Sequence, residues 1–219
     1  AVLRQFHETH RDLWLGELSD RADALEAAAQ EVTRRMGLSP AEFLPFAAAW
    51  PQVREGYLAW LAKAQEQQGL RFESAEQWLE RSLGPLQLVG QIDRIDALQA
   101  DDMGDAGGAR LIGYKTESLS TTQARVKDPG EDTQLAFYAA LMPERAVQAA
   151  YVNVGEKTGT RLVDQPELAA AREALCKGML SDTSRIAAGH ALRALGEGAV
   201  CDYCAARGLC RKDFWSLPR

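Results

Sequence analysis

The sequence predicts an α/β fold in which a mixed sheet is flanked by helices and preceded by a helical N-terminal region. Three observations predict it. Apolar residues recur at helical spacing through residues 1–67. Extended segments follow between residues 70 and 116, and helix, strand and helix alternate after residue 132. This order of elements is typical of a sheet packed against helices.

The N-terminal region predicts three helices. The first covers residues 3–18, and the second covers residues 19–37, between a serine suited to an N-cap and a glycine suited to a C-cap. The third begins at Ser39, with Pro40 at the first helical position. We expect Pro51 to kink or interrupt this helix because proline lacks an N–H.

The middle of the chain predicts strands. Extended pieces are expected at residues 70–73, 78–83 and 86–95. Residues 99–108 are rich in Gly, Asp and Ala and predict a turn, and a further strand is expected at residues 109–116. The last two strands are expected to form an antiparallel hairpin.

The sequence from residue 117 onward predicts alternating helices and strands. A polar loop is expected at residues 117–132, a helix at 132–141, a strand at 146–154 and a long helix at 166–190. An irregular tail follows at residues 197–219.

We therefore expect one domain over residues 1–219, made of a helical region (1–67), a core (68–196) and a cysteine-containing tail (197–219). The sequence starts with alanine and enters a helical pattern at once. We expect a C-terminal fragment of a longer protein.

Composition narrows the function. No stretch approaches the ~18 apolar residues that cross a bilayer, which predicts a cytoplasmic protein without a membrane segment. The net charge of −6 argues against gripping nucleic acid by bulk charge, although bound cations could compensate. No Gly-rich loop ending in Gly-Lys-Ser/Thr is present, so the sequence contains no obvious ATPase motor.

The predicted hairpin can place a carboxylate beside a lysine. Side chains alternate along a strand, so Gly113, Lys115 and Glu117 share one face of the second strand. Asp93 on the first strand can lie next to Lys115. Such a pair suits metal-assisted phosphodiester hydrolysis, with the carboxylate holding Mg²⁺ and the lysine acting on the attacking water. A cross-strand ion pair on a solvated face is the alternative.

Further motifs surround this pair. In chain order they are His7, the motif Gly90-x-x-Asp93-Arg94-Ile95-Asp96, the motif Gly113-Tyr114-Lys115-Thr116 and the motif Gln134-x-x-x-Tyr138. The series resembles the PD-(D/E)XK nuclease superfamily, in particular the C-terminal nuclease domains of RecB- and AddB-like DNA repair proteins, the exonuclease V type. The resemblance covers about residues 3–215. It implies a restriction-endonuclease-like fold and DNA hydrolysis with Mg²⁺ or Mn²⁺.

The resemblance implies a role for each matching residue. Asp93 would ligate the metal and take part in catalysis, and the backbone carbonyl of Tyr114 would add a ligand. Lys115 would be the catalytic lysine. Gln134 and Tyr138, one helical turn apart, would face the site and bind DNA or orient the lysine. Ordinary helix packing is the alternative for this last pair.

His7 would supply a further metal ligand, which RecB-like members bring from an N-terminal helix. The family pattern has a histidine followed seven residues later by an aromatic residue, and His7 and Trp14 fit it. A histidine on a helix surface is the alternative.

The sequence departs from the family at Gly113, where the superfamily usually has an aspartate. Glycine offers neither a ligand nor a charge, and loss of an inner-shell carboxylate is expected to cost more than the ~10–100-fold typical of outer-shell losses. Three explanations compete. Gly113 is a change introduced during cloning, the natural protein is a degenerate nuclease, or Glu117 supplies the carboxylate. The last requires the strand to continue past Thr116.

The tail contains the thiolate motif Cys201-x-x-Cys204-x-x-x-x-x-Cys210. In AddB-like nucleases, three such cysteines join one upstream cysteine to hold a [4Fe–4S] cluster. No cysteine precedes His7 here, so we expect the cluster to be absent from this fragment. Zinc ligation and unligated cysteines are the alternatives. Cys176 is expected to be a packing residue.

Two functions of different classes follow. The first is an exonuclease module that binds DNA and works with the helicase domain or subunit of a repair and recombination complex. The second is a non-catalytic DNA-binding or scaffolding domain that kept the fold after losing the carboxylate at position 113. A different metallohydrolase is a third option, against which the Gln134-x-x-x-Tyr138 motif argues.

Overall fold

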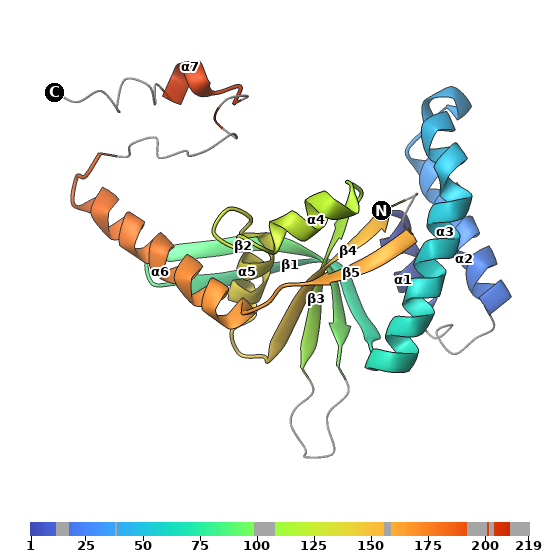
Figure 1. Ribbon diagram of the computed structural model, residues 1–219, viewed down its shortest axis with the longest axis horizontal. Coiled ribbons are helices and arrows are strands. Elements are labelled where there is room, and N and C mark those ends of the chain that lie inside the picture. The colour runs from blue at the N-terminus through green and yellow to red at the C-terminus, as the bar shows by residue number, and fades with distance from the viewer. Residues whose placement is uncertain are drawn as a thin grey trace, which may run out of the picture. The chain divides into compact units, whose positions relative to one another are not determined.

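The computed structural model describes residues 1–11, 18–37, 39–98, 108–155, 159–191, 201 and 204–210. The chain forms two compact units, Ala1–Lys177 and Gly178–Arg219. The helices are α1 (Val2–Thr9), α2 (Leu18–Arg35), α3 (Pro40–Gln68), α4 (Leu119–Arg125), α5 (Gln134–Leu141), α6 (Leu168–Ala187) and α7 (Arg207–Cys210) (Figure 1). The strands are β1 (Arg71–Leu83), β2 (Leu86–Ala97), β3 (Ala109–Lys115), β4 (Val147–Gly155) and β5 (Gly159–Asp164).

The first unit contains one five-stranded sheet in the order β1-β2-β3-β4-β5. β1 with β2, β2 with β3, and β4 with β5 pair antiparallel, whereas β3 and β4 pair parallel. The predicted α/β fold with a mixed sheet is therefore confirmed, as is the predicted hairpin of β2 and β3. The arrangement is consistent with the restriction-endonuclease-like fold that the resemblance implies.

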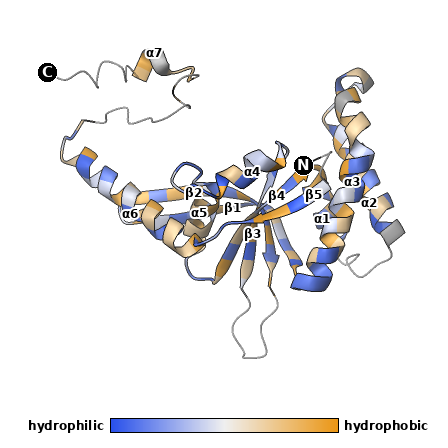
Figure 2. Ribbon diagram, viewed as in Figure 1, coloured by the Kyte–Doolittle hydropathy of each residue, from blue (hydrophilic) through white to orange (hydrophobic). Residues whose placement is uncertain are grey.

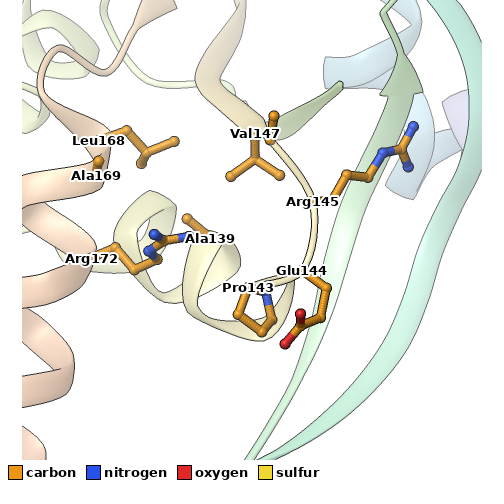
Figure 3. A pocket seen from close by; sticks show the side chains of 9 residues that line it. Ala139, Pro143, Glu144, Arg145, Val147, Leu168, Ala169 and Arg172 are labelled. Carbon is orange, nitrogen blue, oxygen red and sulfur yellow. The ribbon is translucent and has the colours of Figure 1, made fainter. Parts of the chain in front are cut away.

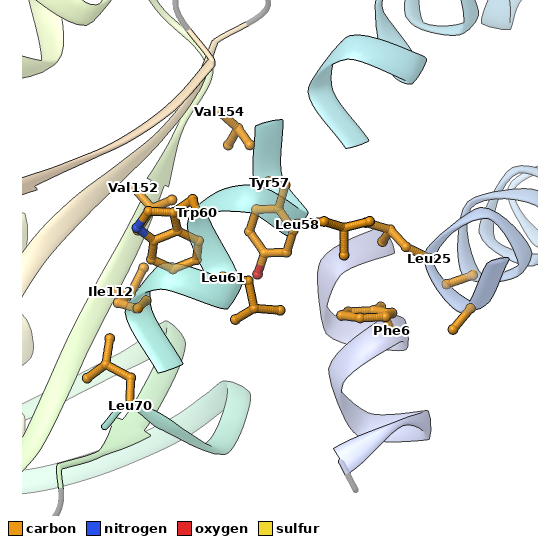
Figure 4. Close-up of a cluster of buried hydrophobic side chains, with 13 residues drawn as sticks. Phe6, Leu25, Tyr57, Leu58, Trp60, Leu61, Leu70, Ile112, Val152 and Val154 are labelled. Carbon is orange, nitrogen blue, oxygen red and sulfur yellow. The ribbon is translucent and has the colours of Figure 1, made fainter. Parts of the chain in front are cut away.

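Helices cover both faces of this sheet. The helices α1, α2 and α3 lie together on one side in Figure 1, and α5 lies on the other. On the first side, Tyr57 and Leu61 of α3 belong to one buried cluster with Ile112 of β3 and Val152 of β4 (Figure 4). This cluster fixes the N-terminal helices against the middle of the sheet.

The second face is covered by the short helix α5. Six of its eight residues are buried, and Figure 2 shows the hydrophobic character of this helix. It lies so close to β2 that a Cβ at Gly90 would come within 2.9 Å of Phe137 and 3.0 Å of Leu141. The glycine thus allows α5 to approach the strand that carries Asp93.

Pro51 does not interrupt α3, which continues through it as one helix of 29 residues. A proline leaves the carbonyl four residues earlier without its helical donor. That residue is Ala47, which is exposed, so water can bond the carbonyl. The start of α3 agrees with prediction, since Ser39 forms a capping box with Glu42.

Four helices and strands differ from the sequence prediction. α1 ends at Thr9, before residue 18. β1 is one continuous strand of 13 residues with an irregular register between Phe72 and Ser74, rather than two pieces. α4 lies within the predicted loop at residues 117–132, and β5 was not predicted. Both are short. α4 buries a single side chain, Thr122, so it has no apolar periodicity to detect.

Two sequence predictions fall on residues outside the described ranges, namely Trp14 and nearly all of the linker at 99–108. Within the described part, none of the helices combines the length and hydropathy that crossing a bilayer requires.

Candidate functional site

Asp93 lies where strands β2 and β3 separate. Their pairing ends at Arg94 and Ile112, so Asp93 and Gly113 are the first residues beyond it. Oδ2 of Asp93 accepts a hydrogen bond of 2.9 Å from the backbone N–H of Tyr114. The carboxylate therefore takes the place of a ladder hydrogen bond and is held beside β3.

Helix α5 presents two polar side chains to this carboxylate. Tyr138 donates its hydroxyl to Oδ1 of Asp93 at 3.2 Å, and Nε2 of Gln134 donates to the Tyr138 oxygen at 2.8 Å. Burial, and then the charge of Asp93, raises the pKa of Tyr138 to about 12. Tyr138 therefore keeps its proton and serves as a hydrogen-bond donor to the carboxylate.

Lys115 completes the same chain of hydrogen bonds. Its Nζ donates to Oε1 of Gln134 at 2.7 Å and lies 4.6 Å from the centre of the Tyr151 ring, a cation–π distance. The structure thus brings together all four predicted catalytic residues, Asp93, Lys115, Gln134 and Tyr138, in one connected cluster.

Tyr151 of β4 belongs to this site, although the sequence analysis did not identify it. Its hydroxyl donates to Oδ1 of Asp132 at 2.6 Å, and burial, together with this bond, raises its pKa well above the usual value. The ring faces Gly113, which is its partner in the parallel pairing of β3 and β4. A Cβ on Gly113 would lie 3.0 Å from two carbons of the ring. The Tyr151 ring therefore fills the space of a side chain at position 113.

Glu117 does not provide a replacement carboxylate. β3 ends at Lys115, so the strand does not continue past Thr116 as this alternative requires. The Glu117 carboxylate is bound by Nε and Nη2 of Arg125 at 2.6 and 2.7 Å and by the hydroxyl of Thr122. These hydrogen bonds, Arg125 first, lower its pKa. Glu117 stabilises the connection between β3 and α4 instead.

Comparison with known proteins decides the family. The family model described as PD-(D/E)XK nuclease superfamily matches residues 1–211. The chain belongs to the PD-(D/E)XK nuclease superfamily. No curated protein sequence matches the chain significantly.

His7 does not join Asp93 in this PD-(D/E)XK domain. Nη1 of Arg94 lies 2.7 Å from its Nε2, and the hydroxyl of Tyr57 lies 2.6 Å from the same atom. Arginine only donates, so Nε2 must accept this bond, and its single lone pair is not available to a metal. His7 is only 6% exposed and stacks on Phe72 at 4.9 Å. The predicted metal-ligand role does not fit this geometry.

The environment of His7 predicts a pH dependence of stability. Burial, and then the charge of Arg94, lowers its pKa well below 6.5. The unfolded chain therefore binds a proton below about pH 6.5 that the folded chain does not, and stability falls as the pH drops. We expect the free energy of unfolding to fall by up to about 1.4 kcal/mol per pH unit between pH 6.5 and 5 from this group.

Urea unfolding at several pH values checks this expectation. His7→Gln, which retains an acceptor for Arg94, should lose this part of the pH dependence, whereas the matched control His10→Gln on the same helix should keep it. An unchanged pH profile in His7→Gln would show that His7 is not the group responsible.

Members of this superfamily generally use Mg²⁺ or Mn²⁺, so the fit of such an ion can be tested against the residues present. Within the described ranges, no three His, Cys, Asp or Glu side chains gather closely enough to hold a metal. Among the described residues, Asp93 is the carboxylate that the side-chain hydrogen bonds of Tyr138, Gln134 and Lys115 lead to, and both its oxygens already accept hydrogen bonds. This donor set does not fit a preformed metal centre. The carbonyl of Tyr114 stays a predicted ligand.

Three cysteines of the second unit, Cys201, Cys204 and Cys210, lie within the described ranges, and Cys204 is exposed. Among the residues that the structure describes, they are not part of a group of three potential ligands. The predicted [4Fe–4S] or zinc ligation therefore stays a prediction. Cys176, on α6, is half-buried.

A separate cavity of about 440 Å³ lies at the other end of α5 (Figure 3). Its lining includes Ala139, Pro143 and the first turn of α6. Arg145 at its edge is already bonded to the carboxylate of Glu73. None of the predicted site residues lines this cavity.

Proposed function

We propose that this chain is a DNA-binding module of a RecB-like repair helicase–nuclease, in which the nuclease fold is kept but phosphodiester hydrolysis is strongly impaired. The observation that carries the proposal is the contact of Gly113 with the Tyr151 ring. A Cβ at this position would lie 3.0 Å from two ring carbons of Tyr151, so the ring crowds the place of the expected side chain. The ring would have to give way by a few tenths of an ångström to admit it.

The rest of the site supports descent from an active nuclease. Asp93 and Lys115 remain connected through Tyr138 and Gln134. A lysine beside a single carboxylate can still attract a phosphate, because its ammonium is not neutralised by an ion pair among the described residues. We therefore propose that DNA binding is retained, with a helicase domain or subunit supplying the motor.

A cleavage assay on linear DNA tests this function. With Mg²⁺ or Mn²⁺, the wild-type chain should bind DNA but cleave it at most weakly, and calorimetry should detect no tight binding of either metal. Gly113→Asp/Tyr151→Val is the matched comparison, since it restores the family carboxylate and removes the ring that crowds it. Robust cleavage of equal rate in both proteins would contradict the proposal. If the wild-type protein does not bind DNA, the proposal that DNA binding is retained is wrong.

A further inference from the structure

The hairpin of β1 and β2 extends beyond the rest of the sheet. β2 pairs with β3 only at residues 94–97, so residues 86–93 pair with β1 alone. An isolated two-stranded hairpin is marginally stable, but α5 supports one face of this one. Arg81 donates to the carbonyl of Ala140, and Phe137 lies against Gly90. The hairpin is therefore a platform that α5 supports on the side of Gly90.

The side of the hairpin opposite to Gly90 carries an exposed aromatic side chain. Trp78 is 60% exposed and Val89 is 39% exposed. Trp78 pairs with Gln91 across the two strands, and Glu80 pairs with Val89. Because side chains alternate along each strand, these four side chains share one face.

The indole is oriented by its neighbours. Nε1 of Trp78 donates to Oε1 of Glu80 at 3.2 Å. This bond satisfies the polar edge of a ring that is 60% exposed. The amide of Gln91 is also held, since its Nε2 donates to the carbonyl of Glu76 at 2.9 Å. The platform is thus a fixed aromatic plane bordered by an amide.

This platform lies close to the candidate site along the same strand. Gln91 is two residues before Asp93, a separation of about 7 Å along a strand. Trp78 lies opposite Gln91, at a Cα spacing of about 5 Å. Because side chains alternate along a strand, Gln91 and Asp93 lie on the same face of β2, so Trp78, Gln91 and Asp93 lie on one face of the hairpin.

We propose that Trp78 stacks against an unpaired base of DNA bound at the Asp93–Lys115 site. This inference rests on the proposed DNA-binding function and names single-stranded DNA as its substrate class. Aromatic side chains hold single strands by stacking with any base, whereas in a duplex the base faces are covered by their neighbours. An amide beside the ring suits hydrogen bonds to a base edge.

Binding of a fluorescently labelled oligothymidylate, measured by anisotropy, tests this role. Trp78→Ala should weaken binding of the single strand by about tenfold, and Trp78→Phe should weaken it much less because it keeps an aromatic plane. Both variants should bind blunt duplex DNA nearly as tightly as the wild-type protein does. The dependence of affinity on salt should stay unchanged, because stacking releases no counterions.

Phe46→Ala is the matched control, since Phe46 is 65% exposed on α3 and is not part of the hairpin. It should bind the oligonucleotide like wild type. If wild type binds the single strand and Trp78→Ala binds it equally well, the stacking role is wrong and the proposed function stands. If Trp78→Ala loses affinity equally for duplex, the role is not base stacking. If wild type binds neither DNA, both proposals are wrong.

Discussion

Replacing Asp96 with alanine should lower the free energy of unfolding by about 3–5 kcal/mol, because it leaves a buried guanidinium without its carboxylate. Arg94 is 1% exposed and Asp96 is fully buried, and Nε of the arginine donates to Oδ1 of the aspartate at 2.7 Å. Arginine stays protonated in proteins, so it cannot escape the loss by becoming neutral.

The other partners of Arg94 cannot replace this carboxylate. Nη1 donates to the hydroxyl of Tyr57 at 2.7 Å and to Nε2 of His7, and both groups are uncharged acceptors. The guanidinium also lies over the rings of Trp60 and Phe72, at 5.6 and 5.7 Å from their centres. These contacts stabilise a cation but carry no compensating negative charge.

Urea unfolding measures this effect, with two controls. Glu31→Ala breaks an exposed i,i+3 pair with Arg34 and should change stability little. The double replacement Arg94→Met/Asp96→Leu should be more stable than Asp96→Ala, since it removes both buried charges together. A loss in Asp96→Ala no larger than in Glu31→Ala would show that Arg94 is not desolvated in the folded protein.

This buried cluster also connects the helical region to the candidate site. The hydroxyl of Tyr114 lies 3.0 Å from that of Tyr57 and accepts from Arg94 at 3.4 Å. The backbone N–H of the same tyrosine holds Asp93. The side chain of Tyr114 thus connects β3 to α3, and its backbone N–H holds the carboxylate of Asp93.

The parts of the site that the sequence predicted are those with local geometry. Lys115 and Gly113 share a strand face because side chains alternate, and Gln134 and Tyr138 share a helix face because they are one turn apart. The β2–β3 hairpin then brings Asp93 to them. These relations follow from short stretches of sequence and common motifs, and the structure shows the same cluster.

The parts of the site that sequence analysis missed depend on contacts between segments that are distant along the chain. Tyr151 reaches Gly113 through the parallel pairing of β3 and β4, and no local pattern sets that register. His7 was expected to bind a metal because the resemblance to RecB-like nucleases implies a ligand at this position. The sequence does not show that Arg94 lies against this histidine. The sequence shows that the expected carboxylate is missing at position 113. It does not show that the Tyr151 ring lies against this position.

Restoring the carboxylate and removing the ring together should produce the largest gain in activity. In Gly113→Asp alone, the new Cβ would lie 3.0 Å from the Tyr151 ring, so the ring or the strand must give way by a few tenths of an ångström to seat the carboxylate. Gly113→Asp/Tyr151→Val removes this conflict. We expect the double variant to bind Mn²⁺ and to cleave linear DNA more than about 100-fold faster than either single variant, since it regains an inner-shell ligand.

The neighbours of Tyr151 can tolerate its removal. Asp132 keeps its ion pair with Arg125 at 2.6 Å and the N–H of Gln134, and Lys115 keeps the Gln134 amide. Calorimetry with Mn²⁺ and a cleavage assay measure the two gains separately. Asp93→Asn on the double background is the control and should abolish both. A folded double variant that binds no metal would show that the site lacks more than one carboxylate, and the occluding ring would then not explain the impairment.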